Sequence, residues 1–297
     1  MGLFLLNSFS RTNEALQTVR WLSPFAYYDA TDAPPVRTPS TNPLLRTAGL
    51  VSLYEQRAGL ATWLLGVTLL AALFVSLAKQ VVDLMLGTDG LRPILEAMTR
   101  AGANAHEAFL GFAWFGPLQL LLALFVVTQV GRWAAEDTDG RLEMVLSTPT
   151  PRWRIVVERA VALVVACSLI ATLGAAATAL TSASLGVALS ASGLASAAFA
   201  LVPLCLSFGA IGALMTGWAP RMAVPVLTTF AVASYFLQHL DQLFKLPEWT
   251  LTVSPFQLYG APLASGVNWP GLWGLLGITA VGFALAIRAM RTREIGR

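Results

Sequence analysis

The sequence predicts an all-α membrane protein with six transmembrane helices and both termini in the cytoplasm, and three observations lead to this fold class. Of the 297 residues, 56% are hydrophobic and only 12% are charged, whereas soluble domains carry about 25% charged residues. The hydrophobic residues form six long runs without internal charges, each close to the ~20 residues that a helix needs to cross a bilayer. The lysines and arginines gather in loops on one side, as they do in the cytoplasmic loops of membrane proteins.

The N-terminal part of the chain is expected to stay outside the hydrocarbon. Residues 1–43 are predicted to be a cytoplasmic segment that ends in a linker, because its stretch rich in proline and threonine cannot hold a regular helix. Asn42 and Pro43 then resemble a helix start, with Asn as the cap and Pro in the first turn. We expect an interfacial helix over residues 44–57; an ordinary amphipathic connector is the alternative.

The membrane domain is predicted to occupy residues 58–297. Its third apolar run is too long for a bilayer, so this helix must tilt, kink or project from the membrane. The same run is rich in small residues, with Gly174 and Thr178 four positions apart, which favours a close helix-packing face over the lining of a substrate path. Prolines inside three runs predict kinks: these are Pro117, Pro203 and Pro225. The six predicted spans are 58–78, 108–131, 158–186, 193–217, 222–240 and 270–288.

The distribution of basic residues sets the predicted orientation. Of the 19 lysines and arginines, those that fall on the outer side are Lys79, Arg92, Arg100 and Lys245. The remainder place both termini in the cytoplasm and the chain in the cell membrane. Tryptophans near the span ends are expected to act as anchors at the level of the lipid headgroups; they are Trp133, Trp153 and Trp218 on the inner side, and Trp249, Trp269 and Trp273 on the outer side.

Several classes of function are disfavoured by residues that the sequence lacks. No ionisable residue stands at the centre of a predicted span, which disfavours an ion-coupled carrier. A P-loop requires GxxxxGK followed by Ser or Thr, whereas Lys79 precedes Gln80 and Lys245 precedes Leu246. The chain is therefore not expected to bind ATP by a P-loop.

Enzymatic, metal and nucleic-acid sites are not expected either. His106 and His239 belong to no HExxH pattern, and no GxSxG nucleophile motif occurs. Cys167 and Cys205 lie in apolar runs without CxxC spacing. The net charge of +3 is too weak to suggest nucleic-acid binding. We therefore predict no catalytic, cofactor-binding or metal-ligating residue.

The predicted cytoplasmic loop 132–154 is the one polar segment with internal order. A helix is expected to break near Gly140, and a short amphipathic turn then presents Leu142 and Leu146 on one side until Pro149 stops it. This pattern is typical of a docking element. A solvated loop without a partner is the alternative.

At this loop the chain resembles the type 2 ABC transporter permeases, and in particular the second half of two-half multidrug and antibiotic exporter permeases. The family pattern has acidic residues, Gly, a hydrophobic residue and Glu, an apolar turn, then Pro and Arg. The matching residues are Glu136, Asp137, Gly140, Leu142, Glu143, Leu146, Ser147, Pro149 and Arg152. A second match precedes the last span, at Ser254, Pro255, Phe256 and Tyr259.

The resemblance implies the transmembrane permease subunit of an ATP-driven ABC exporter. Its partners would be a separate ABC ATPase subunit, which binds ATP and Mg, and a second permease copy, as a homodimer or a heterodimer. Residues 132–154 would be the ATPase-coupling loop, with Glu136, Asp137 and Glu143 facing the ATPase. Residues 247–268 would form a short re-entrant hairpin at the outer side, because this segment is too polar to span the membrane.

A short internal sequence repeat supports the same resemblance. Ser23, Pro24, Phe25, Tyr28 and Ala30 repeat the spacing of the motif that begins at Ser254. Residues 1–32 therefore look like the end of a separate first half, although no apolar span comes after them before Arg57. The chain is either a natural half-size permease or a truncated product.

The apolar, weakly charged interior of the spans favours a hydrophobic drug, antibiotic or lipid-like cargo. Two other functions remain open from the sequence: a membrane anchor or assembly protein that transports nothing, and an ion-coupled secondary carrier.

Overall fold

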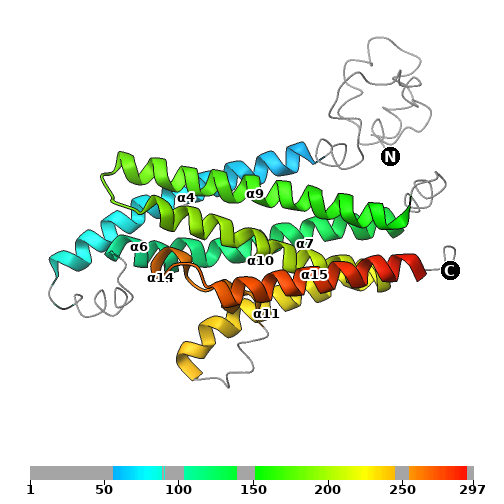
Figure 1. Ribbon diagram of the computed structural model, residues 1–297. Coiled ribbons are helices and arrows are strands. Elements are labelled where there is room, and N and C mark those ends of the chain that lie inside the picture. The colour runs from blue at the N-terminus through cyan, green and yellow to red at the C-terminus, as the bar shows by residue number, and fades with distance from the viewer. Residues whose placement is uncertain (1–55, 89, 91–103, 139–150, 245–253, 293–297) are drawn as a thin grey trace, which may run out of the picture. The chain divides into compact units, whose positions relative to one another are not determined.

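The computed structural model describes residues 56–88, 90, 104–138, 151–244 and 254–292, which form a bundle of helices (Figure 1). No strand occurs within these ranges. The helices are α4 (Arg57–Gly87), α6 (Ala105–Leu110), the π-helix η4 (Gly111–Phe115), α7 (Gly116–Thr138), α9 (Arg152–Ser184), α10 (Ala191–Trp218), α11 (Pro220–Phe244), α13 (Pro255–Tyr259), α14 (Pro262–Ser265) and α15 (Trp269–Thr292).

Six helical segments are long and apolar enough to cross a membrane, which confirms the predicted number and order of spans. The second is continuous through α6, η4 and α7, and the third, α9, extends over 33 residues. Pro203 and Pro225 lie inside α10 and α11, so these two helices continue past their prolines. The six segments are Arg57–Gly87, Ala105–Glu136, Arg152–Ser184, Ala191–Trp218, Pro220–Gln238 and Trp269–Arg291.

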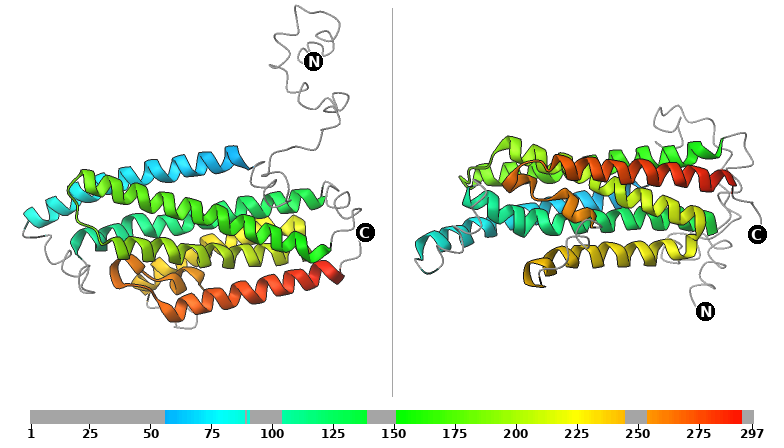
Figure 2. Two further views of the ribbon diagram at one scale, coloured as in Figure 1. Left: turned by 45° about the horizontal axis from the view of Figure 1, so that its top comes forward. Right: turned by 60° about the horizontal axis from the view of Figure 1, so that its bottom comes forward.

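The six long helices run side by side and alternate in direction between two ends of the bundle (Figure 2). We call the end where α7 finishes and α9 begins the loop end, because residues 139–150 connect them. The opposite end, which carries α13 and α14, is the hairpin end. Helix α10 is central and packs against α7, α9, α11 and α15.

Glycines let α10 approach its neighbours closely. A Cβ on Gly212 would overlap Val130 of α7, and one on Gly209 would overlap Leu163 of α9. In lipid, where the hydrophobic effect does not drive helices together, such close contact gains dispersion energy. The core therefore forms around α10, where Leu201, Leu204 and Phe208 are fully buried.

The small-residue face of α9 packs against other helices, as the sequence predicts. Gly174 faces Val67 of α4: a Cβ added to Gly174 would lie 2.9 Å from Val67 Cγ1. The hydroxyl of Thr178 donates to the Gly174 carbonyl at 2.8 Å and accepts a hydrogen bond from Trp114 Nε1 at 3.1 Å. Trp114 and Thr178 are both fully buried. This stripe therefore joins α9 to α4 and η4.

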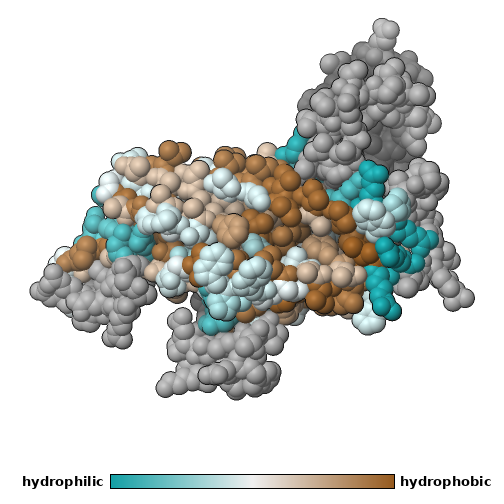
Figure 3. All heavy atoms as spheres, viewed as in Figure 1, coloured by the Kyte–Doolittle hydropathy of each residue, from teal (hydrophilic) through white to brown (hydrophobic). Residues whose placement is uncertain are grey.

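Large apolar side chains face outward from the bundle. In α4, Leu65, Leu69, Leu73 and Leu77 are exposed at four-residue spacing, a stripe suited to contact with lipid chains. Figure 3 shows hydrophobic residues along much of the visible face, with strongly hydrophilic residues gathered where α15 ends. An ordinary soluble protein does not expose so large an apolar surface.

Trp133 was predicted to be a headgroup anchor, and this prediction is wrong. The residue is only 4% exposed and belongs to the hydrophobic core, and the Arg159 guanidinium of α9 lies over its ring. Four other tryptophans are exposed near helix ends, as anchors require; they are Trp153, Trp218, Trp269 and Trp273. The predicted anchor Trp249 lies outside the described residues.

Two predicted N-terminal elements fall wholly or mostly outside the described residues. Residues 1–43, and residues 44–55 of the expected interfacial helix, lie outside the described residues. The remaining two residues of that helix belong to the start of α4, where Gln56 is the N-cap and Arg57 the first helical residue.

Candidate functional site

The predicted coupling loop begins and ends in described helices. Glu136 and Asp137 lie in the last turn of α7, and Arg152 is the first residue of α9. The remaining predicted residues lie outside the described ranges; they are Gly140, Leu142, Glu143, Leu146 and Pro149. The structure thus gives the two helix ends between which this loop is held.

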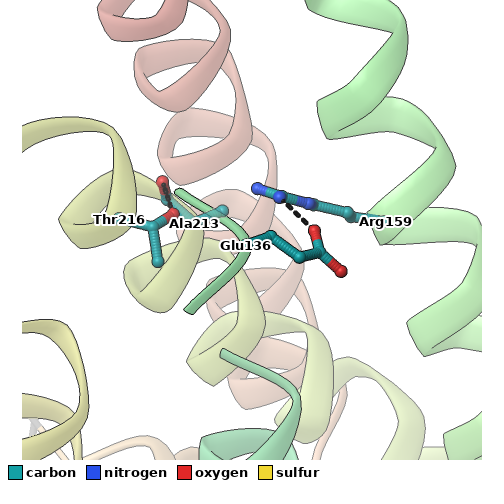
Figure 4. A network of polar contacts seen from close by, with 4 residues as sticks. All are labelled: Glu136, Arg159, Ala213 and Thr216. Atoms are coloured by element: carbon teal, nitrogen blue, oxygen red, sulfur yellow. Dashed lines mark hydrogen bonds and ion pairs between the residues drawn. The ribbon is translucent and has the colours of Figure 1, made fainter. Parts of the chain in front are cut away.

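An ion pair joins these two helix ends. Arg159 Nη2 donates to Glu136 Oε2 at 2.6 Å (Figure 4). The Arg159 side chain is only 11% exposed, while that of Glu136 is 46% exposed. The guanidinium also lies over the Trp133 ring, 5.7 Å from its centroid, at the distance of a cation–π contact. This pair fixes the end of α7 to the first turns of α9.

A second ion pair at the loop end lies within one helix. Arg154 Nε donates to Glu158 Oε1 at 2.8 Å, four residues along α9. Because the Arg154 side chain is 52% exposed, solvent screens this pair strongly. It supports α9 locally and joins no other helix.

The predicted hairpin residues all lie inside the protein at the hairpin end. Ser254 occupies the N-cap position of α13, and its hydroxyl donates to the Ser234 carbonyl of α11 at 3.1 Å. Pro255 occupies the first helical position, where a missing N–H costs nothing. Phe256 packs against Phe208 of α10, with ring centroids 5.2 Å apart. Together these contacts hold α13 against α10 and α11.

Tyr259 completes this attachment. Its hydroxyl donates to the Ala197 carbonyl of α10 at 3.2 Å, and the side chain is 2% exposed. Burial raises the pKa of Tyr259 well above its ordinary value, so the hydroxyl stays protonated and remains a donor. The four predicted hairpin residues thus anchor α13 to the bundle.

The hairpin itself is held by a tight connection to α15. Asn268 Nδ2 donates to the Leu258 carbonyl at 3.1 Å, and Gly271 N donates to Asn268 Oδ1 at 3.2 Å. A Cβ on Gly271 would overlap the Leu258 carbonyl oxygen. The turns at Gly260 and Gly266 use positive φ angles of 73° and 78°, which favour glycine.

Polar contacts also hold the connection between α9 and α10 at this end. Glu107 of α6 is 8% exposed, and its Oε1 accepts from the Ser190 amide at 2.6 Å. Asn104 donates to the Ala188 carbonyl at 3.1 Å, and Lys79 of α4 donates to the Leu185 carbonyl at 2.8 Å. The hairpin end is therefore joined by side chains from several helices.

A cavity of about 180 Å³ lies beside the hairpin. One wall comes from α6, η4 and the start of α7, a second from α11, and a third from α14 and the turn before it. No charged residue lines it among those that the structure describes. Its lining residues are Ala108, Gly111, Phe112, Gly116, Gln119, Tyr235, Gln238, Gly260, Ala261 and Ala264.

Gln119 is the exceptional residue in this cavity. Its side chain is 4% exposed, and its Oε1 is the one buried side-chain oxygen or nitrogen without a hydrogen-bond partner in the described part of the chain. Nearly all buried polar atoms in proteins have a partner. The oxygen itself is buried, so it is shielded from the cavity as well as from solvent.

The wall that holds Gln119 begins with a π-helix. In η4 the chain winds more widely than an α-helix, and the Gly116 amide donates to the Gly111 carbonyl five residues earlier. Pro117, the second residue of α7, follows Gly116 and has no N–H to donate. π-Helical turns in longer helices are frequent at functional sites.

The sequence prediction missed this cavity. Gln119 lies in a run whose pattern predicts only a span, and Tyr235 and Gln238 come from another span more than 100 positions away. A signal was present in the chain, since Gln119 is an amide within an apolar run two residues after Pro117. Sequence alone does not show that these spans meet beside the hairpin.

Comparison with known proteins gives one family. Residues 44–291 match the family model described as "Multidrug efflux system permease Rv1217c, C-terminal domain". The match includes all six candidate spans, together with the loop 132–154 and the hairpin. No curated protein matches the chain.

Proposed function

Because the chain belongs to the family of the multidrug efflux permease C-terminal domain, we propose that it is the transmembrane subunit of an ATP-driven ABC exporter. Six apolar helices make it a multi-pass membrane protein of a transporter family. The single observation that carries the further step to ATP-driven export is the loop 132–154, whose residues match the coupling pattern of type 2 ABC permeases.

The loop end is suited to transmitting force from a partner. Packed side chains and salt-bridge networks carry a displacement from one helix to its neighbour. The Glu136–Arg159 ion pair joins α7 and α9 on either side of the loop. We propose that a cytoplasmic ABC ATPase, with ATP and Mg bound to it, acts on the loop and that α7 and α9 move together.

The proposed complex contains two permease units, identical or different, in the cell membrane. The distribution of basic residues favours an orientation with both termini in the cytoplasm. Alternating access of the two units would then carry the cargo outward. The charged residues of the described spans lie near the helix ends, which favours a hydrophobic drug, antibiotic or lipid-like cargo over an ion.

The test is co-purification in detergent with a candidate ATPase encoded beside this chain. We compare the wild type with Leu142→Asp and Glu143→Arg in the loop. The matched control is Asp83→Arg, which reverses an exposed charge near the hairpin end of α4. We expect the wild type and the control to retain the ATPase and each loop variant to lose it.

Other outcomes identify the alternatives. If all variants retain the ATPase, the loop 132–154 is not the element that binds it. If no ATPase is retained even from native membranes, the exporter proposal loses its energy source, and the non-transporting anchor becomes the better hypothesis. Uptake or efflux that requires only a proton gradient would instead indicate an ion-coupled carrier.

A further inference from the structure

We propose that the exposed face of α7 at the loop end binds an anionic phospholipid, whose headgroup phosphate lies between Arg132 of α7 and Arg221 of α11. The inference goes beyond the proposed function, because it requires only that the chain spans a membrane and involves neither an ATPase nor the movement of cargo. The ligand is a phosphate diester that carries acyl chains.

This face of α7 lies between two other helices. Gly131 is close to α11, since a Cβ added to it would lie 3.4 Å from Val224 Cγ2. The next residue, Arg132, reaches the other way: a Cβ added to Gly59 of α4 would lie 3.2 Å from Arg132 Nη2. Thr128, one turn before Arg132, is exposed. Consecutive residues of α7 therefore touch α11 and α4, with an open face between them.

Two arginines border this face. Arg221 is the second residue of α11 and shares a side of that helix with Val224, three residues later. Both Arg132 and Arg221 are exposed, and neither forms an ion pair with another described residue. The acidic side chain described one turn after Arg132 is that of Glu136, and it is bonded to Arg159. Two positive charges thus remain on this face.

These charges favour a phosphate group. A guanidinium matches two oxygens of a phosphate with two parallel hydrogen bonds. Basic pockets between transmembrane helices on the cytoplasmic side are known to bind anionic lipid headgroups. Arg132 also lies within the candidate span Ala105–Glu136, so its charge is held at the edge of the hydrocarbon and can reach the headgroup level by extending its side chain.

The surface beside Arg132 favours a lipid over a free phosphate ion. Leu121, Leu124 and Thr128 lie on the same side of α7 as Arg132, at spacings of three and four residues. Both leucines are partly exposed, and the Thr128 hydroxyl donates to the Phe125 carbonyl of its own helix at 2.6 Å. An apolar strip therefore runs from the arginines into the depth of the membrane. Acyl chains gain contact with it, whereas a free ion does not.

The test measures lipid binding to the purified full-length chain by native mass spectrometry. The probes are dioleoyl phosphatidylglycerol and dioleoyl phosphatidylcholine, which share their acyl chains and phosphate but differ in net charge. The measured quantity is the dissociation constant of the first bound lipid. We expect the wild type to prefer phosphatidylglycerol by about thirtyfold, about fivefold from each arginine. Equal affinity for the two lipids would overturn the proposal.

Variants locate the preference on this face. Arg132→Gln and Arg221→Gln are each expected to lower it by about fivefold, while the corresponding lysine variants, which keep the charge, should retain most of it. The matched control is Arg154→Gln, which removes an exposed arginine of α9 that is paired with Glu158. It should keep the preference. An equal loss in this control would indicate attraction to the overall charge of the loop end and would overturn the assignment.

Two further outcomes identify other occupants. Inorganic phosphate in excess, at matched ionic strength, should leave phosphatidylglycerol bound; its displacement would indicate a site for a free anion and overturn the lipid. A dimeric chain that binds both lipids equally would assign the face to a second copy. If the glutamine variants do not fold, as judged by size-exclusion chromatography, the wild-type comparison still decides the proposal. No ATPase is present, so this result and the earlier co-purification are independent.

Discussion

At the scale of the residue, the bundle depends on positions where a single methyl group does not fit. A Cβ on Gly212 would overlap Val130 Cγ2 and would lie 3.1 Å from Leu227 Cδ2. Val130 is β-branched and stiff at χ1, so it cannot yield as a longer side chain could. The contact of α10 with α7 and α11 is therefore set by the absence of one side chain.

We predict that Gly212→Ala lowers the free energy of unfolding by about 1–3 kcal/mol, the usual cost of overpacking a core. Unfolding would be monitored by circular dichroism in mixed micelles with increasing SDS. Gly66→Ala is the control, because its Cβ would meet no atom within 4 Å; there the better helix propensity of alanine should add up to about 1 kcal/mol. Equal effects of the two changes would contradict this account.

At the scale of the element, α7 and α9 are joined by the Glu136–Arg159 ion pair, whereas the Arg154–Glu158 pair lies within α9 alone. The two pairs have similar lengths, 2.6 and 2.8 Å, but Arg159 is far less exposed than Arg154. Burial and the Trp133 ring should make the first pair the stronger one.

We predict that Arg159→Met lowers the free energy of unfolding by about 1–2 kcal/mol, because a charge-assisted hydrogen bond is lost while the half-exposed Glu136 regains water. Arg154→Met, which removes a screened surface pair, should change it by less than about 1 kcal/mol. Both variants would be measured by the same SDS titration. A larger effect at Arg154 would show that burial does not decide the strength of these pairs.

The spans themselves can be predicted from the sequence, but which face of each span is buried in the bundle cannot. In α4, Val67, Ala71 and Val75 are buried while Leu65 and Leu69 are exposed. All five are apolar, so hydropathy cannot separate them; the difference is that smaller side chains permit close helix contact. The burial of Trp133 was missed for a related reason, because its surroundings include other helices, among them α9, whose Arg159 lies over the ring.

The site residues show the same division. The motif at Ser254 to Tyr259 coincides with a short helix, α13, since its proline acts locally at the first helical position; its role as an outer re-entrant hairpin stays a prediction. The cavity required knowledge of which helices meet: Gln119, Tyr235 and Ala264 come from three separate parts of the chain. Local patterns therefore predicted elements, and only the packing of elements revealed the cavity.

At the scale of the whole molecule, the two ends of the bundle should lie on opposite sides of the membrane. Ser265 of α14 is exposed at the hairpin end, and Arg291 is exposed in the last turn of α15 at the loop end. The native Cys167 and Cys205 are fully buried, so they should not react with a water-soluble reagent.

We predict that Ser265→Cys is labelled by a membrane-impermeant maleimide in intact cells, while Arg291→Cys is labelled only after the membrane is permeabilised. This outcome is expected from the positive-inside orientation. The unchanged chain serves as the control and should remain unlabelled. The reverse pattern would invert the orientation, and labelling of both variants in intact cells would contradict a protein that spans the membrane.

The π-helix η4 has a consequence for how such a protein diversifies. Each residue added to a helix rotates the later turns of that helix by about 100°, and a π-helical turn is one residue wider than an α-helical turn. A single-codon insertion or deletion at Gly111–Phe115 would therefore rotate the start of α7 against α6. One mutational step there would change both the side chain in the cavity wall and the face that α7 packs into the core, where Leu118 and Leu122 are now buried, so the length of this turn is under strong constraint.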